Sequence, residues 1–182
     1  MTVQGRVRGR FRRRPLLGGV LTVGLVGAIA IFALQARPGA NSPATVRLER
    51  GYVGTTYAFD GGVCLSAPRV AAKVLVVEVE QEPGSTTRLV RPPEGARPTL
   101  GFPAADEGAD VAGYRITPGG DDCTLRLLVT PSQPGTLRPG TVSVRLAYGP
   151  FGMLRRTARV RPAVTLDVIG EGTDPRTSTS GG

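Results

Sequence analysis

Acidic side chains stand beside both cysteines of this 182-residue chain, in the pattern that could most readily do chemistry. Asp60 precedes Cys64 in the segment FDGGVC, and Asp121 and Asp122 precede Cys123 in GGDDC. If the cysteines bond, the three carboxylates converge, and carboxylate oxygens are ligands that Ca²⁺ prefers. Aspartate is also the ordinary residue of a Gly-rich turn, because its side chain bonds to nearby backbone. Both interpretations stay open, with these three aspartates as weak candidates for a cation site.

Side chains for catalysis are scarce. The chain has no histidine, which removes Ser-His-Asp and Cys-His pairs, imidazole bases and most zinc or copper sites. Lys73 follows Ser66 at a spacing other than that of the Ser-x-x-Lys motif. Glu78, Glu80 and Glu82 alternate along one segment, which is typical of the wet face of a strand and not of a glycosidase carboxylate pair. We expect a protein that is not an enzyme and needs no cofactor.

The two cysteines predict one intramolecular disulfide, Cys64 to Cys123. An exported β domain meets an oxidising compartment, and a single pair leaves no odd thiol. Cys123 also shares the parity of the apolar Leu125 and Leu127, while Cys64 opens a strand after a similar Gly-rich turn. The alternatives are two buried free thiols or a metal pair, although a metal pair lacks further cysteines or histidines to complete it.

Strands must position these residues, because apolar and polar residues alternate along four segments. Leu75, Val77 and Val79 share one parity, and the same pattern recurs in segments 123–130, 142–148 and 164–168. Weaker candidates lie at 45–50, 52–59, 63–67, 87–91, 111–117 and 154–161. Frequent prolines after residue 67 break the chain too often for long helices. The sequence therefore predicts an all-β domain, an antiparallel β-sandwich of seven to nine strands, with a partly closed barrel as the alternative.

An apolar run precedes this domain. Residues 16–34 carry no charge, and as a helix they would span roughly 28 Å, close to the thickness of a bilayer core. Positive side chains before such a helix keep its amino end in the cytoplasm. These membrane-orienting residues are Arg6, Arg8, Arg10, Arg12, Arg13 and Arg14. We expect a single-pass signal-anchor in the cell membrane, with the carboxy terminus extracytoplasmic.

Five segments follow from this interpretation. They are a basic cytoplasmic tail at 1–15, the transmembrane helix at 16–34, a linker at 35–44, the β domain at 45–169 and a disordered tail at 170–182. A charged start and an apolar run also describe a secretory signal, and cleavage near Ala36 would give a secreted protein. The length of the apolar run favours retention, because the core of a signal peptide is shorter.

The positive charge sits mostly in the amino-terminal tail. The formal net charge is +9, but after residue 35 there are 17 basic residues against 14 acidic ones. Nucleic-acid binding needs a basic stripe, usually with aromatic platforms for single strands, and the chain has no tryptophan. We expect no nucleic-acid partner.

The segment LRLLVTPSQPGTLRPGTVSVRLAY, residues 125–148, resembles the late hairpin of bacterial immunoglobulin-like or fibronectin-type-III-like ectodomains. In those domains a Pro-Gly loop precedes a strand that ends in tyrosine. The composition, with 22 arginines and Lys73 as the one lysine, is similar to that of actinobacterial single-pass membrane proteins. The resemblance implies an immunoglobulin-like or fibronectin-like β-sandwich as the ectodomain.

Two functions remain open at this point. The first is a membrane-anchored extracytoplasmic interaction or scaffolding module, whose partners are the lipid bilayer through residues 16–34 and another envelope protein. The alternative is an exported ligand-binding or accessory subunit, linked to a cation at the acidic turns. A stoichiometric protein partner would favour the first, and stabilisation by calcium without a partner would favour the second.

Overall fold

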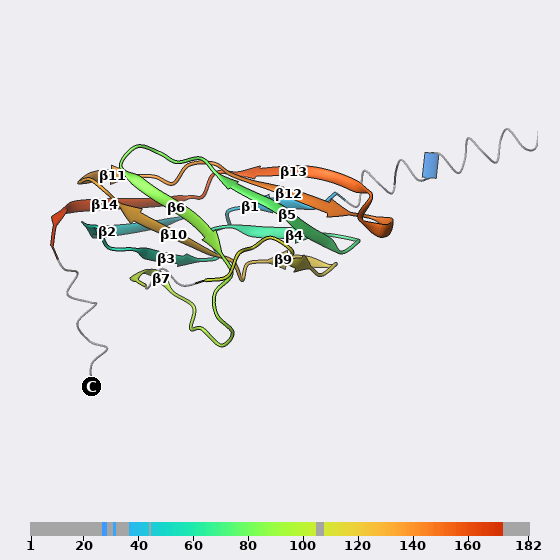
Figure 1. Cartoon of the computed structure of the whole chain (residues 1–182), viewed down its shortest axis with the longest axis horizontal. Coiled ribbons are helices and arrows are strands. Elements are labelled where there is room, and N and C mark those ends of the chain that lie inside the picture. The colour runs from blue at the N-terminus through green and yellow to red at the C-terminus, as the bar shows by residue number, and fades with distance from the viewer. Residues whose placement is uncertain (1–26, 29–30, 32–36, 44, 105–107, 173–182) are drawn as a thin grey trace, which may run out of the picture. The chain divides into compact units, whose positions relative to one another are not determined.

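A computed structural model describes residues 27–28, 31, 37–43, 45–104 and 108–172 (Figure 1). The chain divides into two units between residues 35 and 36, and every strand of the described residues belongs to the second unit. The six orienting arginines lie outside the described residues, as does the predicted membrane span except for residues 27, 28 and 31. Within the described part of the chain, no helix is long and apolar enough to cross a membrane.

The described residues of the second unit form fourteen strands and one short 3₁₀ turn, η1. The strands in the first half are β1 (Gly39–Asn41), β2 (Val46–Val53), β3 (Tyr57–Asp60), β4 (Cys64–Ala67), β5 (Ala72–Val79), β6 (Ser85–Val90) and β7 (Leu100–Pro103). The remaining elements are β8 (Arg115–Ile116), β9 (Gly120–Asp122), β10 (Arg126–Pro131), β11 (Gly135–Leu137), β12 (Val142–Tyr148), η1 (Pro150–Gly152), β13 (Leu154–Val160) and β14 (Val164–Glu171).

These strands form four small sheets, with the orders β1-β4-β9, β6-β10-β3-β7, β11-β14-β2 and β13-β12-β5-β8. All neighbours are antiparallel except β14 and β2, which are parallel. The prediction of an all-β domain with antiparallel sheets is confirmed. The strand number exceeds the predicted seven to nine because several strands are interrupted. For example, only residues 61–63 separate β3 from β4, and residues 123–125 separate β9 from β10.

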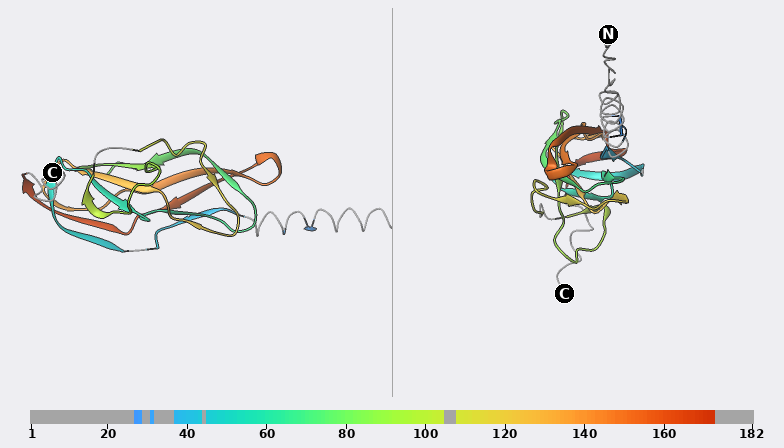
Figure 2. Two further views of the ribbon diagram at one scale, coloured as in Figure 1. Left: turned by 90° about the horizontal axis from the view of Figure 1, so that it is seen from below. Right: turned by 90° about the vertical axis from the view of Figure 1, so that its right-hand side faces the viewer.

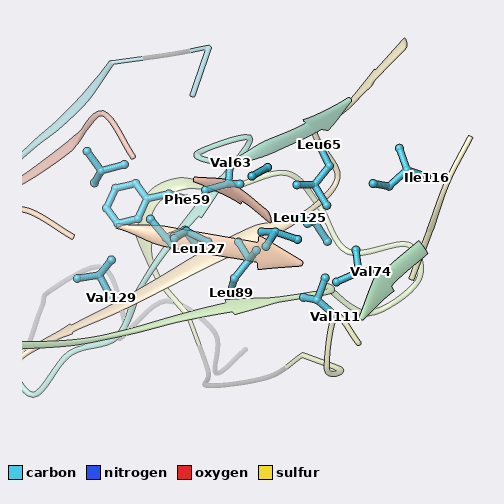
Figure 3. Packing of buried hydrophobic residues seen from close by; sticks show 14 of the residues in the cluster. Phe59, Val63, Leu65, Val74, Leu89, Val111, Ile116, Leu125, Leu127 and Val129 are labelled. Carbon is cyan, nitrogen blue, oxygen red and sulfur yellow. The ribbon is translucent and has the colours of Figure 1, made fainter. Parts of the chain in front are cut away.

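One hydrophobic core joins the four sheets. Its fully buried side chains include one from each sheet, Phe59 on β3, Leu65 on β4, Leu146 on β12 and Leu166 on β14. Figure 3 shows part of this core, with Phe59 and Leu65 labelled. Burying a side chain of this size contributes roughly 1.5–3 kcal/mol, so the shared core is the main source of stability. The sheets therefore belong to one folded domain that carries the candidate site on its surface.

The parallel pair β2 and β14 is joined to β11 through one carboxylate. Asp167 on the central strand β14 accepts a hydrogen bond of 2.9 Å from Arg47 Nε on β2 and one of 2.7 Å from Thr136 Oγ1 on β11. The bond from Thr136 and the pairing with Arg47 lower the pKa of Asp167. The side chain is solvent-accessible, so we assign this contact a role in strand register and only a small one in stability.

A β-bulge in β5 changes which residues face the core. Arg145 lies opposite Val76 while the next residue of β12, Leu146, lies opposite Val74, so Leu75 has no opposing residue. Val74 is consequently fully buried, whereas Leu75 is only partly buried. The predicted alternation holds over residues 75–79, where Leu75, Val77 and Val79 are partly buried and Val76 and Glu78 are exposed. It did not predict the buried Val74, because the bulge inserts one residue and reverses the alternation there.

This bulge gives an expected difference between two alanine variants. Val74→Ala should lower the free energy of unfolding by roughly 2 kcal/mol, because it leaves a cavity in the shared core. Leu75→Ala removes a larger side chain but should cost less, since Leu75 lies outside that core. Urea unfolding of both variants measures the two values. A larger loss for Leu75→Ala would contradict the position of the bulge.

The β domain begins earlier than the sequence predicted. Residues 39–41, which fall in the predicted linker 35–44, form β1 and pair with β4, with Gly39 opposite Ser66 and Asn41 opposite Cys64. At the other end β14 continues to Glu171, two residues beyond the predicted boundary at 169. The segment 173–182 of the predicted tail lies outside the described residues. Short strands containing glycine give no alternation to recognise, and only the partner strand reveals them.

Candidate functional site

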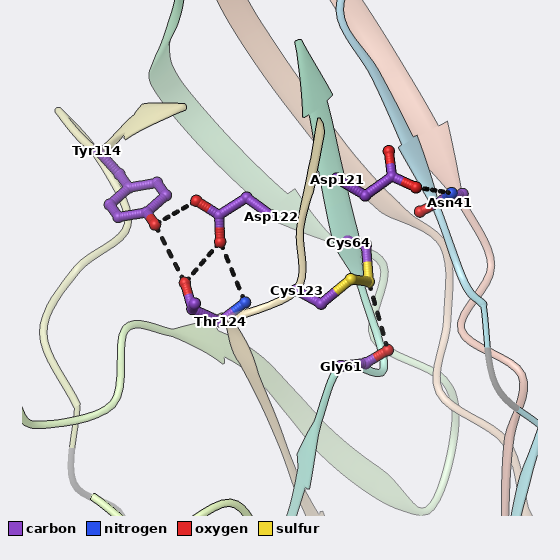
Figure 4. The surroundings of a disulfide bond; sticks show 8 residues. All are labelled: Asn41, Gly61, Cys64, Tyr114, Asp121, Asp122, Cys123 and Thr124. Carbon is purple, nitrogen blue, oxygen red and sulfur yellow. Dashed lines mark hydrogen bonds between the residues drawn. A yellow bond between two sulfur atoms is a disulfide. The ribbon is translucent and has the colours of Figure 1, made fainter. Parts of the chain in front are cut away.

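The disulfide between Cys64 and Cys123 is present, as predicted, with a Cα–Cα distance of 4.2 Å (Figure 4). Cys64 begins β4 and is fully buried, while Cys123 directly follows β9 and is exposed. The bond therefore joins two neighbouring strands of one sheet. Cys64 Sγ also lies 3.8 Å from the carbonyl oxygen of Gly61, a contact without a hydrogen bond because a disulfide sulfur carries no proton.

The disulfide does not bring Asp60, Asp121 and Asp122 together. Asp121 accepts a hydrogen bond of 3.4 Å from Asn41 Nδ2 on β1, and Asp122 turns toward Thr124 and Tyr114 (Figure 4). Asp60 accepts hydrogen bonds from Arg126, as described below. Among the described residues, no three Asp, Glu, Cys or His side chains are grouped to hold a metal ion. The carboxylates instead act as hydrogen-bond acceptors for neighbouring strands and turns.

Tyr114 and Asp122 form the polar wall on one side of the disulfide. The Tyr114 hydroxyl donates to Asp122 Oδ2 and lies 3.0 Å from Thr124 Oγ1, which itself donates to Asp122 Oδ1 over 2.7 Å. Partial burial and the hydrogen bond to the Asp122 carboxylate raise the pKa of Tyr114, so the phenol stays protonated at neutral pH. This arrangement holds the turn before Cys123 in one conformation.

Asp60 and Arg126 form an ion pair that the sequence did not predict. Arg126 Nε and Nη2 donate to the two carboxylate oxygens of Asp60 over 2.8 and 3.0 Å. The same carboxylate accepts a 2.6 Å hydrogen bond from the Thr99 backbone N–H, and Arg126 Nη2 lies 3.2 Å from the Arg97 carbonyl oxygen. The Asp60 carboxylate raises the pKa of Arg126. The pair thus fastens the loop that contains Arg97 and Thr99 to strands β3 and β10.

Two segments distant in sequence cover the outer face of β10, the loop bonded to Arg126 and Ala104 after β7. Arg126 and Leu128 have the parity that predicts solvent exposure, yet the two residues are buried, at 7% and 2% exposure of the whole residue. Leu128 packs with Ala58, Val90 and Ala104 in a second, small apolar cluster. Alternation along one strand cannot reveal such a cover, because the covering segment is distant in sequence. The contact between the arginine and the aspartate is visible only in three dimensions.

A cleft of about 900 Å³ lies between this loop and the turn that carries the disulfide. The loop supplies one wall with residues such as Pro93, Ala96 and Pro98, which are themselves exposed. Tyr114, Cys123 and Thr124 line the opposite wall, and the ion pair of Asp60 with Arg126 lies at its base. The remaining lining residues are Gly61, Arg91, Pro92, Glu94, Gly95 and Ala109. The sequence indicated only a turn at residues 92–95, so the cleft itself is a product of the tertiary fold.

This arrangement is suited to binding. Asp60 and Arg126 are already paired within the protein, whereas the exposed side chains of Arg91 and Glu94 form no ion pair with a described residue and can contact a ligand. Its walls combine proline rings with exposed backbone and a tyrosine hydroxyl, surfaces that an extended polypeptide can contact through its own backbone and apolar side chains.

Comparisons with known proteins give little beyond this geometry. No family model matches the chain, and no curated protein matches it. Among solved structures, the VesB protease of Vibrio cholerae matches 77% of this chain and 34% of its own, with 10% sequence identity and a TM-score of 0.39. The chain thus spans about a third of that structure's length. A likeness this weak bears on neither the fold nor the activity.

Proposed function

We propose that this chain is a membrane-anchored, extracytoplasmic interaction module that binds a segment of another envelope protein in the cleft beside the disulfide. The disulfide supports an oxidising compartment, because such bonds are rare where the cytoplasm keeps thiols reduced. The charge asymmetry around residues 16–34 supports an anchor with its amino end in the cytoplasm. The lack of histidine supports a role in binding over one in catalysis.

The proposal includes an immunoglobulin-like sandwich as the scaffold. Constant-type immunoglobulin domains place strands A, B, E and D in one sheet and C, F and G in the other. In this chain the equivalents of A, B, E and D are β1, the interrupted strand β3/β4, the interrupted strand β9/β10 and β6, which are neighbours in that order. The equivalents of C, F and G are β5, β12 and β13. The disulfide departs from the antibody pattern, since it joins the equivalents of B and E within one sheet and not B and F across two.

The cleft is the observation that carries the binding function. A volume of about 900 Å³ is within the range of ligand sites, and Pro92, Pro93 and Pro98 restrict the backbone of the wall before a ligand arrives. An ordered wall reduces the entropy lost on binding. Besides the closed Asp60–Arg126 pair, the lining offers backbone and apolar surfaces and one exposed side chain of each charge, Arg91 and Glu94. This mixture favours an extended polypeptide over a metal ion or a small anion.

A photocrosslinking experiment tests this function. A benzoylphenylalanine residue at position 96 lies in the wall of the cleft, and one at position 45 replaces an exposed residue just before β2. In intact cells the probe at 96 should give one discrete crosslinked envelope protein, and the probe at 45 should not. Ala96→Trp should reduce recovery of the same protein in detergent by about tenfold, the effect of losing about 1.4 kcal/mol of binding free energy.

Thr45→Trp is the matched control, since Thr45 and Ala96 are both exposed and both lie outside strands. Both tryptophan variants should keep the melting temperature of the parent protein. Equal crosslinking at positions 96 and 45, or unchanged recovery of the partner with Ala96→Trp, would contradict a binding role for the cleft. Stabilisation of the purified protein by calcium or a small metabolite, with no protein crosslink, would favour the ligand-binding alternative.

A further inference from the structure

Exposed apolar side chains gather at the turn between β12 and β13. Phe151 is 99% exposed, Met153 is 70% exposed and Leu154 is 37% exposed, within four residues of chain. Single exposed apolar residues are normal on a protein surface, whereas apolar residues exposed together at one turn are a candidate contact surface. We call residues 149–154 the hairpin tip.

The backbone conformation at Phe151 in the hairpin tip is also unfavourable for a bulky side chain. Phe151 has φ 53° and ψ 18°, a left-handed conformation that costs a bulky side chain conformational energy. Its fully exposed ring gains no packing in return. A strained and unpacked phenylalanine therefore adds nothing to folding, and such features point to a function outside the folded domain.

A basic pocket adjoins the hairpin tip. Its volume is about 570 Å³, and Phe151 forms part of its wall together with Lys73, Arg115 and Arg155. None of these three cations forms an ion pair with a described residue, and no acidic side chain of the described chain lines the pocket. Three unpaired cations around one cavity fit an anionic group such as a phosphate.

Charge is segregated along β5. Lys73 is the second residue of the strand, next to Ala72, which pairs with Tyr148 at the base of the hairpin tip. Glu78 lies near the opposite end, and Glu80 and Glu82 follow it there, with Glu82 3.2 Å from Arg161. We call the end with Lys73, Arg115 and Arg155 the basic end. The carboxylates of Glu78, Glu80 and Glu82 lie away from it, while Asp121, opposite Ser66 near this end, accepts a hydrogen bond from Asn41. A domain with this polarity would orient its basic end toward an anionic surface.

The basic end is also where the chain enters the domain. Gly39, the first residue of β1, pairs with Ser66, which lies next to the β4–β5 connection and hence at the same end as the hairpin tip. Figure 1 and Figure 2 show the turn between β12 and β13 at the end of the domain opposite to the carboxy-terminal end of β14. From residue 34, the end of the proposed membrane span, five chain steps reach residue 39, at most roughly 18 Å when extended.

We propose that the hairpin tip docks on the membrane surface, with Phe151 and Met153 in the lipid interface and a phosphate of an anionic lipid in the pocket of Lys73, Arg115 and Arg155. Apolar side chains flanked by arginines bind at such interfaces through burial of their surface and attraction to anionic headgroups. This inference rests on the anchor in the proposed function. Docking would hold the domain close to the bilayer and turn the far end of the domain away from it.

The test uses the full chain in lipid nanodiscs and an environment-sensitive dye. Because both native cysteines are bonded, the dye reacts only with an introduced thiol, at Met153→Cys in the hairpin tip or at Ser132→Cys beyond β10. In nanodiscs containing phosphatidylglycerol, the dye at 153 should shift to shorter emission wavelengths and be quenched by lipid-bound quenchers. The dye at 132 should behave as in water. Neutral nanodiscs should reduce the response at 153 severalfold.

Two variants with the label at 153 separate the contribution of the apolar Phe151 from that of the three basic side chains. Phe151→Gly places glycine in a conformation that suits it, so the domain stays folded while the emission shift is reduced. Lys73→Gln with Arg115→Gln and Arg155→Gln should remove the difference between anionic and neutral nanodiscs. Melting temperatures confirm that both variants are folded.

Docking would be contradicted if the dye at 153 stays in water in anionic nanodiscs, or if its emission shift is equal in anionic and neutral lipid. It would also be contradicted if glycerol phosphate gives the full emission shift in neutral nanodiscs, or if the shift occurs only after envelope proteins are added. A chain that fails to co-elute with the nanodiscs would instead contradict the anchor itself, so the two failures are distinguishable.

Discussion

Removal of the disulfide by Cys64→Ala with Cys123→Ala is expected to lower the free energy of unfolding by about 4 kcal/mol. The bond closes a loop with a sequence separation of 59, and in the chain-entropy model a loop of that length costs the unfolded chain about 4 kcal/mol of entropy. For a domain of this size, the melting temperature should fall by roughly 10 to 15 °C. Alanine is the suitable replacement because Cys64 is fully buried, and serine would bury an unpaired hydroxyl there.

Chemical reduction of the unmodified protein provides the matched comparison. Reductant should lower the melting temperature of the parent protein to nearly that of the double variant and leave the double variant unchanged. Circular dichroism during heating, with and without reductant, measures all four values. A parent protein whose melting temperature ignores reduction would show that the bond does not hold the domain together.

Loss of Arg126 from the Asp60–Arg126 pair is expected to have the next largest effect on the free energy of unfolding. The two side chains are only 9% and 15% exposed, for Arg126 and Asp60 respectively, and removing one partner of a buried pair leaves the other charge without compensation. Arg126→Met should lower the free energy of unfolding by about 3 kcal/mol, at the lower end of the range for buried pairs. Urea unfolding at neutral pH measures the loss. The loss is at the lower end of that range because Asp60 keeps its hydrogen bond from the Thr99 backbone N–H.

The neutral pair Asp60→Asn with Arg126→Met separates this charge effect from packing. Asparagine still accepts the Thr99 N–H and leaves no buried charge, so the double variant should be more stable than Arg126→Met alone. Limited proteolysis adds a local measurement, since both variants lose the bond to the Arg97 carbonyl and should be cut faster in residues 91–99. A double variant less stable than the single one would show that the buried charge is not the cause.

The local pattern of the sequence predicted most strands. The four segments with clear alternation correspond to the strands β5, β10, β12 and β14. Alternation is a local property of a half-buried strand, so it can be recognised without knowledge of the partner strand. The strands that it missed, β1, β7, β9 and β11, are three or four residues long and contain glycine. Such segments are defined by their hydrogen bonds to a neighbour, and the neighbour is distant in sequence.

The candidate site shows the same limit at single residues. The pairing of the two cysteines followed from their number and compartment, and the structure confirms it. The meeting of Asp60 with Arg126 was not predicted, because 66 positions separate them and the parity of Arg126 indicates a solvent-facing side chain. The aspartates beside the cysteines were predicted to converge, yet each faces a different neighbour. A disulfide sets the distance between two backbones but not the direction of the adjacent side chains.

By itself, then, the sequence determined the all-β class, the disulfide and most of the strand positions, because alternation, proline placement and cysteine number act locally or by count. Only the tertiary structure decided the bulge at Leu75, the loop that covers β10, the cleft and the gathering of apolar and basic side chains at the hairpin tip. Each of these depends on which distant segments become neighbours. That choice is made by the packing of the whole core, which no single segment of the chain encodes.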